Sequence, residues 1–381
     1  MESGERKIYE LLRTADSMEH GESRLAVYEE AIGLADREHL TELQIRTRLD
    51  AIQESVFYLD AMKGVVMYPV MLKIADEYRA DTGREPSDLH TILWQYKWIL
   101  DNAVDFYQVT RSQFQHLAED CMKRYQEHGY SLRTVYAIMF SFYQHIDLEL
   151  AKKYYNEFLQ QKRDSMSDCL ACEKCMEMKF LLEYGWEKEA LDRAKSVFDG
   201  RLTCVEQPGG VYIGLINYIV RQKIRDKSVN EELEVKLKDY AEHVRTYIVR
   251  RHLLMDDIGN MLMYYCLYEP NKALGWIKKY CDYTEKWMEP AGIFEFSLGM
   301  MMFLGRIRDN KKSERPTYRM KMDSRFQFYN EAGVYDIQEM YDYYDGMAGG
   351  IAKKFEENQE RRDFQEMYRA VKADLWKKFR K

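Results

Sequence analysis

The stretch from residue 168 to residue 204 constrains the fold most, because it has the pattern of a complete pair of helices. Small and apolar residues recur there at spacings of three and four, which places them on one face of a helix. The residues that follow this pattern are Cys169, Cys172, Met176, Phe180 and Leu181. Gly185 and Gly200 mark the ends of the first and second helix, since glycine readily adopts the positive φ of a helix C-terminus. We expect Ser167 or Asp168 to cap the first helix through a side-chain oxygen.

The same layout recurs along the chain, with Ala151, Ala190 and Ala273 at matching small positions in the second helix of a pair. The first two are 39 residues apart and the third follows 83 residues later. A helix-pair unit of about 40 residues is typical of stacked repeat arrays. The sequence therefore predicts an all-α fold, a right-handed α-solenoid of antiparallel helix pairs with a curved superhelical path.

The expected helices begin with 5–17 and end with 360–378, and a kink is expected at Pro69. Residues 1–305 are predicted to form the repeat array and residues 334–381 to form capping helices. Residues 306–333 interrupt the pattern and are predicted to be a basic loop or insertion. The expected helices are 5–17, 22–38, 41–58, 61–80, 88–105, 109–127, 131–146, 148–162, 169–184, 186–199, 211–226, 230–249, 251–268, 271–287, 291–305, 334–358 and 360–378.

Composition excludes several classes of protein. Only six prolines and 20 glycines occur in 381 residues, which argues against an all-β or a disordered chain. A net charge of −7 favours neither a nucleic-acid binder nor a membrane binder. The first residues lack the apolar core of a secretory signal, and the most apolar run, 296–305, is half of the roughly 20 residues that a membrane span needs. We therefore expect a cytoplasmic protein whose seven cysteines are thiols or metal ligands rather than disulfides.

Several short motifs sit at equivalent places in the helix pairs. They are Gly185-Trp186-Glu187-Lys188-Glu189-Ala190-Leu191, Tyr28 with Ala31, Ala151 with Tyr155 and Phe158, Ile213-Gly214, and Ile258-Gly259. On these residues the chain resembles tetratricopeptide repeats over about residues 20–290, although its units are nearer 40 residues than the family's roughly 34. The resemblance implies a solenoid whose first helices line a concave, partner-binding face.

A narrower resemblance rests on Cys169, Cys172, Gly200-Arg201-Leu202-Thr203-Cys204 and Pro208, together with Ile351-Ala352-Lys353-Lys354-Phe355. These strings are similar to those of uncharacterised tetratricopeptide-like proteins of Gram-positive bacteria. Members often carry a histidine directly after the proline, where this chain has Gly209. The resemblance implies no established activity.

The cysteines of the 168–204 hairpin are the first candidate site. In an antiparallel helix pair the end of the second helix returns to the start of the first, so Cys204 is expected near Cys169 and Cys172. Three thiolates could bind Zn²⁺ tetrahedrally, with Cys175, Asp168 or a water molecule as the fourth ligand. The zinc would be structural, because the motif supplies no separate general base. Small buried packing residues and a thiol-redox centre are the alternatives for these cysteines.

The second candidate site is a peptide groove on the first helices of the pairs. Asparagine can bond both the donor and the acceptor of a peptide backbone, and tyrosine suits adaptable binding surfaces. The candidate ligand-binding residues are Tyr136, Asn217, Tyr218, Asn260, Tyr264 and Glu295. Packing between repeats is the alternative role for each of them.

Motifs of the common catalytic classes, such as His-Glu-x-x-His, Gly-x-Ser-x-Gly and the glycine-rich phosphate loop, do not occur in the sequence. We therefore expect a non-enzymatic scaffold or sensor that binds a protein or peptide and has a regulatory role. The alternative is a zinc-binding or thiol-redox protein that uses Cys169, Cys172, Cys175 and Cys204. A third hypothesis, RNA binding by the basic residues of 306–325, is disfavoured by the acidic total charge. The oligomeric state is left open.

Overall fold

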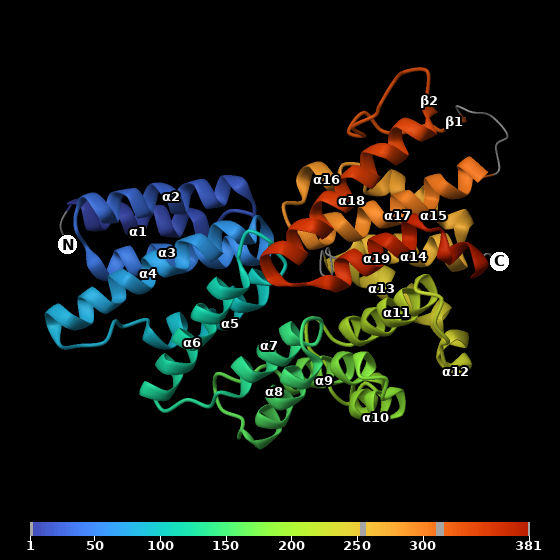
Figure 1. Cartoon of the computed structure of the whole chain (residues 1–381). Coiled ribbons are helices and arrows are strands. Elements are labelled where there is room, and N and C mark those ends of the chain that lie inside the picture. The colour runs from blue at the N-terminus through green and yellow to red at the C-terminus, as the bar shows by residue number, and fades with distance from the viewer. Residues whose placement is uncertain (1–2, 252–256, 310–315, 380–381) are drawn as a thin grey trace. The chain divides into compact units, whose positions relative to one another are not determined.

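The computed structural model describes residues 3–251, 257–309 and 316–379, and these residues are predominantly α-helical (Figure 1). The prediction of an all-α fold built from helix pairs is therefore confirmed. Internal contacts divide the chain into two compact units, residues 1–138 with 161–167 and residues 139–160 with 168–381. The superhelical path and the module boundaries at residues 305 and 333 stay predictions.

The first unit consists of helices joined by short turns, and consecutive helices pack against each other. Tyrosines tie them together from inside: the Tyr68 hydroxyl donates to the Ile92 carbonyl at 2.6 Å, and that of Tyr125 donates to the Leu93 carbonyl at 3.0 Å. Its helices are α1 (Ser3–Asp16), α2 (Glu22–Arg37), α3 (Thr41–Tyr58), α4 (Ala61–Thr82), α5 (Leu89–Ala103), α6 (Arg111–Glu127) and the start of α7 (Arg133–Tyr143).

The second unit is organised around α11, which packs against α9, α13, α14 and α19. Its helices are the end of α7, then α8 (Leu148–Gln160), α9 (Leu170–Glu183), α10 (Glu187–Phe198), α11 (Gly209–Ile224), α12 (Glu231–Val235), α13 (Leu237–Arg251), α14 (Ile258–Tyr268), α15 (Pro270–Lys279), α16 (Tyr283–Lys286), α17 (Pro290–Asp309), α18 (Ile337–Gln359), α19 (Arg362–Lys372) and the short 3-10 helix η2 (Leu375–Phe379). Strand β1 (Thr317–Arg319) pairs with β2 (Val334–Asp336) in antiparallel register, Tyr318 opposite Tyr335.

The positions that define the repeat are buried as predicted. Ala151 and Ala190 have no exposed surface and Ala273 has 1% exposed, so their small side chains let neighbouring helices approach closely. Gly185 and Gly200 follow the helices of the predicted hairpin with φ of +79° and +70°. That left-handed conformation is the one in which glycine avoids the steric cost of a Cβ atom.

Several element bounds differ from the expected ones. The helix expected over 230–249 is broken into α12 and α13, and the one over 271–287 into α15 and α16. Helix α17 runs four residues past its expected end, and the expected loop that follows contains β1. Three-residue strands are too short to produce the alternation by which a strand is recognised in a sequence. Pro69 lies inside α4 without ending it.

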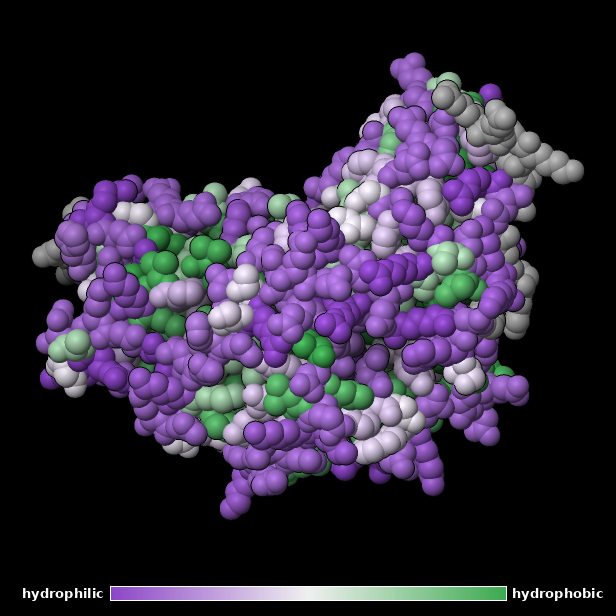
Figure 2. Space-filling model, in the orientation of Figure 1, coloured by the Kyte–Doolittle hydropathy of each residue, from purple (hydrophilic) through white to green (hydrophobic). Residues whose placement is uncertain are grey.

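The surface view in Figure 2 shows a largely hydrophilic face with scattered hydrophobic patches. This agrees with the charged outer faces expected of amphipathic helices. Within the described ranges, none of the helices combines the length and the apolar character needed to cross a membrane.

Candidate functional site

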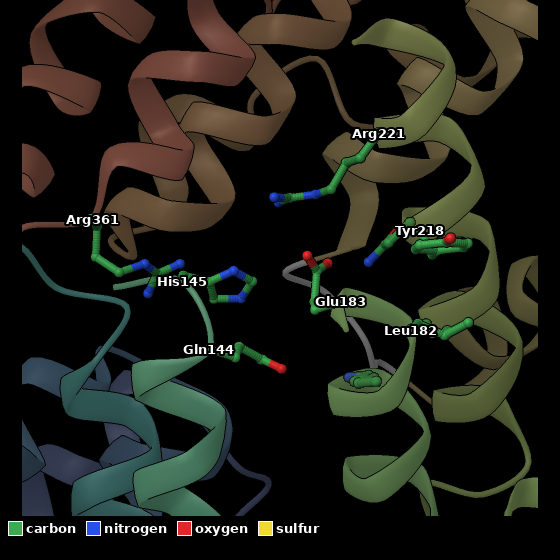
Figure 3. Close-up of a pocket in the computed structure, with 10 residues that line it drawn as sticks. Gln144, His145, Leu182, Glu183, Tyr218, Arg221 and Arg361 are labelled. Carbon is green, nitrogen blue, oxygen red and sulfur yellow. The ribbon is translucent and has the colours of Figure 1, made fainter. Parts of the chain in front are cut away.

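A small polar pocket of about 140 Å³ lies within the second unit, around the middle of α11. Figure 3 shows Gln144, His145, Glu183, Arg221 and Arg361 gathered from separate segments: the turn after α7, the end of α9, α11 and the turn between α18 and α19. The lining residues are Gln144, His145, Lys179, Leu182, Glu183, Gly214, Asn217, Tyr218, Arg221 and Arg361.

Two arginines of the pocket are held by carboxylates. The Arg361 guanidinium donates to both oxygens of Asp363, with Nε–Oδ1 and Nη2–Oδ2 distances of 2.9 Å. Arg221 donates to one oxygen of Glu295, which is 5% exposed. Burial raises the pKa of Asp363, but the Arg361 guanidinium, with a smaller contribution from Arg221, outweighs that effect and holds the pKa below its usual range. Both pairs therefore present charges that are already balanced inside the protein.

The side-chain amides near α11 have a defined orientation. Nδ2 of Asn217 and Nδ2 of Asn260 donate to the same oxygen of Asp257, at 2.9 and 3.2 Å. A flipped amide would turn its carbonyl toward a carboxylate, so this contact fixes which atom is oxygen. Oδ1 of Asn217 is consequently directed away from Asp257. It is buried and has no hydrogen-bond partner among the described residues, and the same holds for Oε1 of Gln144.

Glu183, at the end of α9, contributes a carboxylate that makes no ion pair or hydrogen bond with the described part of the chain. In Figure 3 this carboxylate lies at the centre of the labelled group, with His145 and Arg221 around it. Among the described residues, the pocket and the side chains that bond its lining hold three cationic side chains and five carboxylates, a net charge of −2. The cations are Lys179, Arg221 and Arg361, and the carboxylates are Glu183, Glu187, Asp257, Glu295 and Asp363.

His145 is neutral at physiological pH in the folded protein. Burial lowers its pKa to about 4, although the Asp363 carboxylate, 3.8 Å from Nδ1, acts in the opposite direction. Arg361 and Arg221 add to the lowering and Glu183 opposes it. A neutral imidazole can both donate and accept a hydrogen bond, which suits a side chain that lines a polar pocket.

The low pKa of His145 predicts a loss of stability in acid. The unfolded chain binds a proton near pH 6.5 and the folded chain only near pH 4, so folding becomes less favourable as pH falls through this window. The loss should approach about 3 kcal/mol. Urea denaturation at several pH values should show the loss in wild type, reduced in His145→Gln. Parallel pH profiles of the two proteins would contradict the assignment.

The hairpin cysteines meet as predicted. The sulfurs of Cys169, Cys172 and Cys204 all lie within 4.8 Å of one another. The Cys172 and Cys204 sulfurs are 3.5 Å apart, far beyond the roughly 2.05 Å of a disulfide, so both are thiols. Glu206 places a carboxylate oxygen 3.4 Å from the Cys172 sulfur. Glu206 thus offers a further potential metal ligand beside Cys172, outside the three groups that all lie within 4.8 Å of one another.

The local structure around these thiols differs from two expectations. The N-cap of α9 is Cys169, whose sulfur accepts the Cys172 N–H at 3.2 Å, rather than Ser167 or Asp168. Ser167 lies too early in the chain, and its hydroxyl is hydrogen-bonded to Asp164. Cys175 does not belong to the thiol group: it lies one turn further along α9 and is 4% exposed.

Burial and the Glu206 carboxylate raise the pKa of the Cys172 thiol well above its ordinary value. Burial also raises the pKa of Cys204, opposed by hydrogen bonds from Cys172 and from the backbone N–H groups of Gln207 and Glu206. In the absence of a cation, both groups are therefore protonated at neutral pH.

The residues predicted to form a peptide groove fall into two groups: some line or contact the polar pocket, and the others pack elsewhere in the protein. Asn217 and Tyr218 line the pocket, and Asn260 and Glu295 contact it through Asp257 and Arg221. The Tyr218 hydroxyl donates to Glu187 at 2.8 Å, and that of Tyr264, which is 1% exposed, donates to Glu269 at 3.0 Å. Tyr136 belongs to the first unit and is not part of this pocket.

Sequence reasoning missed Glu183, Arg221, His145, Arg361 and Glu206. A weak signal existed for Glu206, because a carboxylate two residues after a candidate metal ligand is itself a candidate. The pocket residues carried no such signal, since each looks like an ordinary polar residue at the end or on the surface of a helix.

Several basic side chains of residues 306–325 make contacts within the protein. Arg306 donates to the Cys266 carbonyl at 3.2 Å, and Arg325 donates to Asp323 and Asp282 at 2.9 and 3.3 Å. The Arg308 guanidinium lies 4.4 Å from the centre of the Tyr341 ring. Lys311, Lys312 and Arg315 fall outside the described residues. RNA binding by this segment stays a hypothesis, with fewer uncommitted charges than the sequence suggested.

Comparison with known proteins adds no functional information. The chain matches no family model, and neither the search of curated proteins nor the search of solved structures finds a match. The chemistry of the pocket and of the thiol group is therefore the basis for assigning a function.

Proposed function

We propose that this protein binds a peptide or protein segment and accepts one basic side chain of that segment in the pocket around Glu183. The observation that supports this proposal is the Glu183 carboxylate, which has no ion-pair partner among the described residues and lies in a pocket with two unpartnered acceptors, Gln144 Oε1 and Asn217 Oδ1. Three oxygen acceptors in one pocket complement an ammonium or guanidinium group, which carries only donors.

The size of the pocket supports a segment rather than a free small molecule. Sites that enclose drug-sized ligands have volumes of roughly 300–1,000 Å³. A volume of about 140 Å³ accommodates a single side chain or a terminal group. The rest of the ligand would then lie outside the pocket, as the backbone of an extended segment does when one of its residues is anchored.

The charge balance favours a cationic over an acidic ligand. Arg221 and Arg361 could attract a carboxylate, but they are bonded to Glu295 and Asp363, and the net charge of the described group is −2. An incoming carboxylate would also lie close to Glu183, and like charges at short range cost free energy. A basic side chain would instead offset part of this negative charge.

The first unit contains a larger groove of about 660 Å³ between α4, α5 and α6, with a mostly apolar lining. It includes Val65, Val66, Pro69, Leu72 and Leu117. Such a lining would accept many apolar segments and so specifies no particular ligand. The pocket of the second unit is the better basis for a function because its groups define a chemistry.

A library of N-acetylated, C-amidated hexapeptides, randomised at every position, would test the proposal. The full-length protein is expected to enrich peptides with lysine or arginine at one position. Glu183→Gln should lose that enrichment, because the amide keeps the shape of the side chain but removes its charge. Binding of a selected peptide should weaken as salt concentration rises.

Glu189→Gln is the matched control, since Glu189 is an exposed residue of the neighbouring helix α10 and does not line the pocket. It should enrich the same peptides as the wild type. Enrichment of acidic peptides would contradict the proposal. So would enrichment of basic peptides that Glu183→Gln leaves unchanged.

A further inference from the structure

We propose that Cys169, Cys172, Cys204 and Glu206 form a tetrahedral zinc site that fastens the start of α11 to the start of α9. The site lies on the hairpin of α9 and α10 and contains none of the residues that line the polar pocket. It is therefore independent of the proposed peptide binding.

Two distances from the Cys172 sulfur are close to those that a zinc ion requires. With Zn–S of about 2.3 Å and Zn–O of about 2.1 Å, tetrahedral angles place two sulfurs about 3.8 Å apart and a sulfur and an oxygen about 3.6 Å apart. The observed distance from the Cys172 sulfur is 3.5 Å to the Cys204 sulfur and 3.4 Å to Oε2 of Glu206. Cys169 completes the group, with its sulfur within 4.8 Å of the other two. Zinc binding would require side-chain rotations that bring the Cys169 sulfur and the Glu206 carboxylate closer to the other ligands.

The identity of the ligands favours zinc over other common cations. Three thiolates with one carboxylate are too soft for calcium or magnesium, which take oxygen ligands. Tetrahedral coordination by sulfur with one harder ligand is typical of Zn²⁺. Four protein ligands leave no open position for a water molecule, so the ion would be structural rather than catalytic.

The surroundings of the sulfurs supply the outer contacts that thiolate ligands need. The Cys172 N–H donates to the Cys169 sulfur at 3.2 Å, at the N-terminus of α9, where the helix dipole favours negative charge. Such donors orient metal ligands and stabilise their charge, and removing them typically weakens binding about 10–100-fold.

The position of the site indicates what the ion would do. Cys169 and Cys172 belong to the first turn of α9, whereas Cys204 and Glu206 lie in the segment between α10 and α11. Directly after them, the buried Gln207 accepts the Val211 N–H at 3.1 Å through Oε1, within the first turn of α11. A bound zinc would thus fix the segment from which α11 begins.

The first test is the metal content of full-length protein purified without added metal, measured by elemental analysis. We expect about one zinc per chain in wild type and in Cys266→Ser, and little or none in Cys172→Ser. Cys266→Ser is a matched control because Cys266 is a buried thiol outside the group, and serine can keep its hydrogen bond to the Gly299 carbonyl. Glu206→Gln should keep the three thiolates but bind zinc at least about 10-fold more weakly.

A second measurement does not depend on the variants folding. Wild-type protein stripped with a chelator under reducing conditions is titrated with Co²⁺, which should give thiolate-to-cobalt charge-transfer absorption and the intense visible bands of tetrahedral cobalt. Hydrogen exchange in residues 204–211 should slow when Zn²⁺ is returned.

Three results would overturn the site: wild-type protein that stays free of zinc and shows no tetrahedral cobalt spectrum, a Cys172→Ser protein that retains its zinc, or a Cys172–Cys204 disulfide in the freshly purified protein. The last would instead support thiol-redox chemistry. None of these measurements involves a peptide, so failure of the zinc site and failure of the peptide proposal are separate outcomes.

Discussion

Replacing Arg221 with methionine is expected to lower the free energy of unfolding by about 3–5 kcal/mol. Arg221 donates to Glu295, whose side chain is only 6% exposed. Methionine fills much of the same volume but leaves the carboxylate buried without its cation. The cost of an unpaired buried charge exceeds that of losing the contact itself, because desolvation is no longer offset. Chemical denaturation monitored by circular dichroism would measure the change.

Two controls separate this cause from general damage to the core. The double variant Arg221→Met/Glu295→Met should regain most of the lost stability, since apolar residues of similar volume often replace a buried ion pair without loss. A double variant as unstable as Arg221→Met would contradict this account. Glu295→Met alone is also expected to destabilise, because it leaves the Arg221 guanidinium unpaired.

The loss in free energy of unfolding caused by Arg221→Met should change with pH in a defined direction. Burial already raises the pKa of Glu295 and Arg221 lowers it, so removing Arg221 should raise that pKa further. A carboxyl group whose folded-state pKa exceeds its unfolded value loses stability as pH rises through the interval between the two values. The deficit relative to wild type should therefore shrink in acid, where Glu295 is protonated in both states. A deficit that is constant with pH would point to a packing defect instead.

Replacing Gly259 with alanine should lower the free energy of unfolding by about 3 kcal/mol or more. A Cβ atom at this position would lie 2.2 Å from the backbone nitrogen of Phe296 and 2.3 Å from the carbonyl carbon of Glu295. These are backbone atoms of α17, so a side-chain rotation cannot relieve the contact. Helices α14 and α17 would have to move apart, and the core between them would lose close packing.

Gly275→Ala is the matched control for Gly259→Ala. Gly275 lies in the next helix, α15, and a Cβ atom there would meet no other atom within 4 Å. Alanine has the higher helix propensity, so this variant should gain about 0.5–1 kcal/mol. Thermal unfolding of both variants beside the wild type would show opposite shifts. A Gly259→Ala variant as stable as the wild type would contradict the close approach of α14 and α17.

The thiol group could be anticipated from sequence because its geometry is local. Cys169 and Cys172 are one turn apart at the start of a helix, and the end of the next antiparallel helix must return close to them. The same reasoning could not settle the fourth ligand. Cys175 follows the three-residue spacing of the other two, but a further turn carries it about 5 Å along the helix axis. Glu206 reaches the group instead because it lies on the returning segment with Cys204.

The polar pocket, unlike the thiol group, could not be assembled from the sequence. Asn217 could be chosen as a binding residue because it lies on the first helix of a predicted pair, and its amide can bond both the donor and the acceptor of a peptide backbone. Glu183 and Arg361 could not be connected with it, since nothing in the sequence relates the end of α9 to the turn after α18. Their proximity results from the packing of α19 against α11, and packing partners distant in the chain leave no periodic signal.

The sequence by itself determined the helices, their pairing into hairpins and the meeting of three cysteines. Each of these follows from residue spacing of three or four, from glycines with positive φ, and from the direction in which a short turn returns the chain. Only the tertiary structure decided that the Glu183 carboxylate has no ion-pair partner among the residues that the structure describes. That outcome depends on how Arg221, Arg361, Glu295 and Asp363 pair across helices distant in the chain, and burial makes the pairing of such charges obligatory.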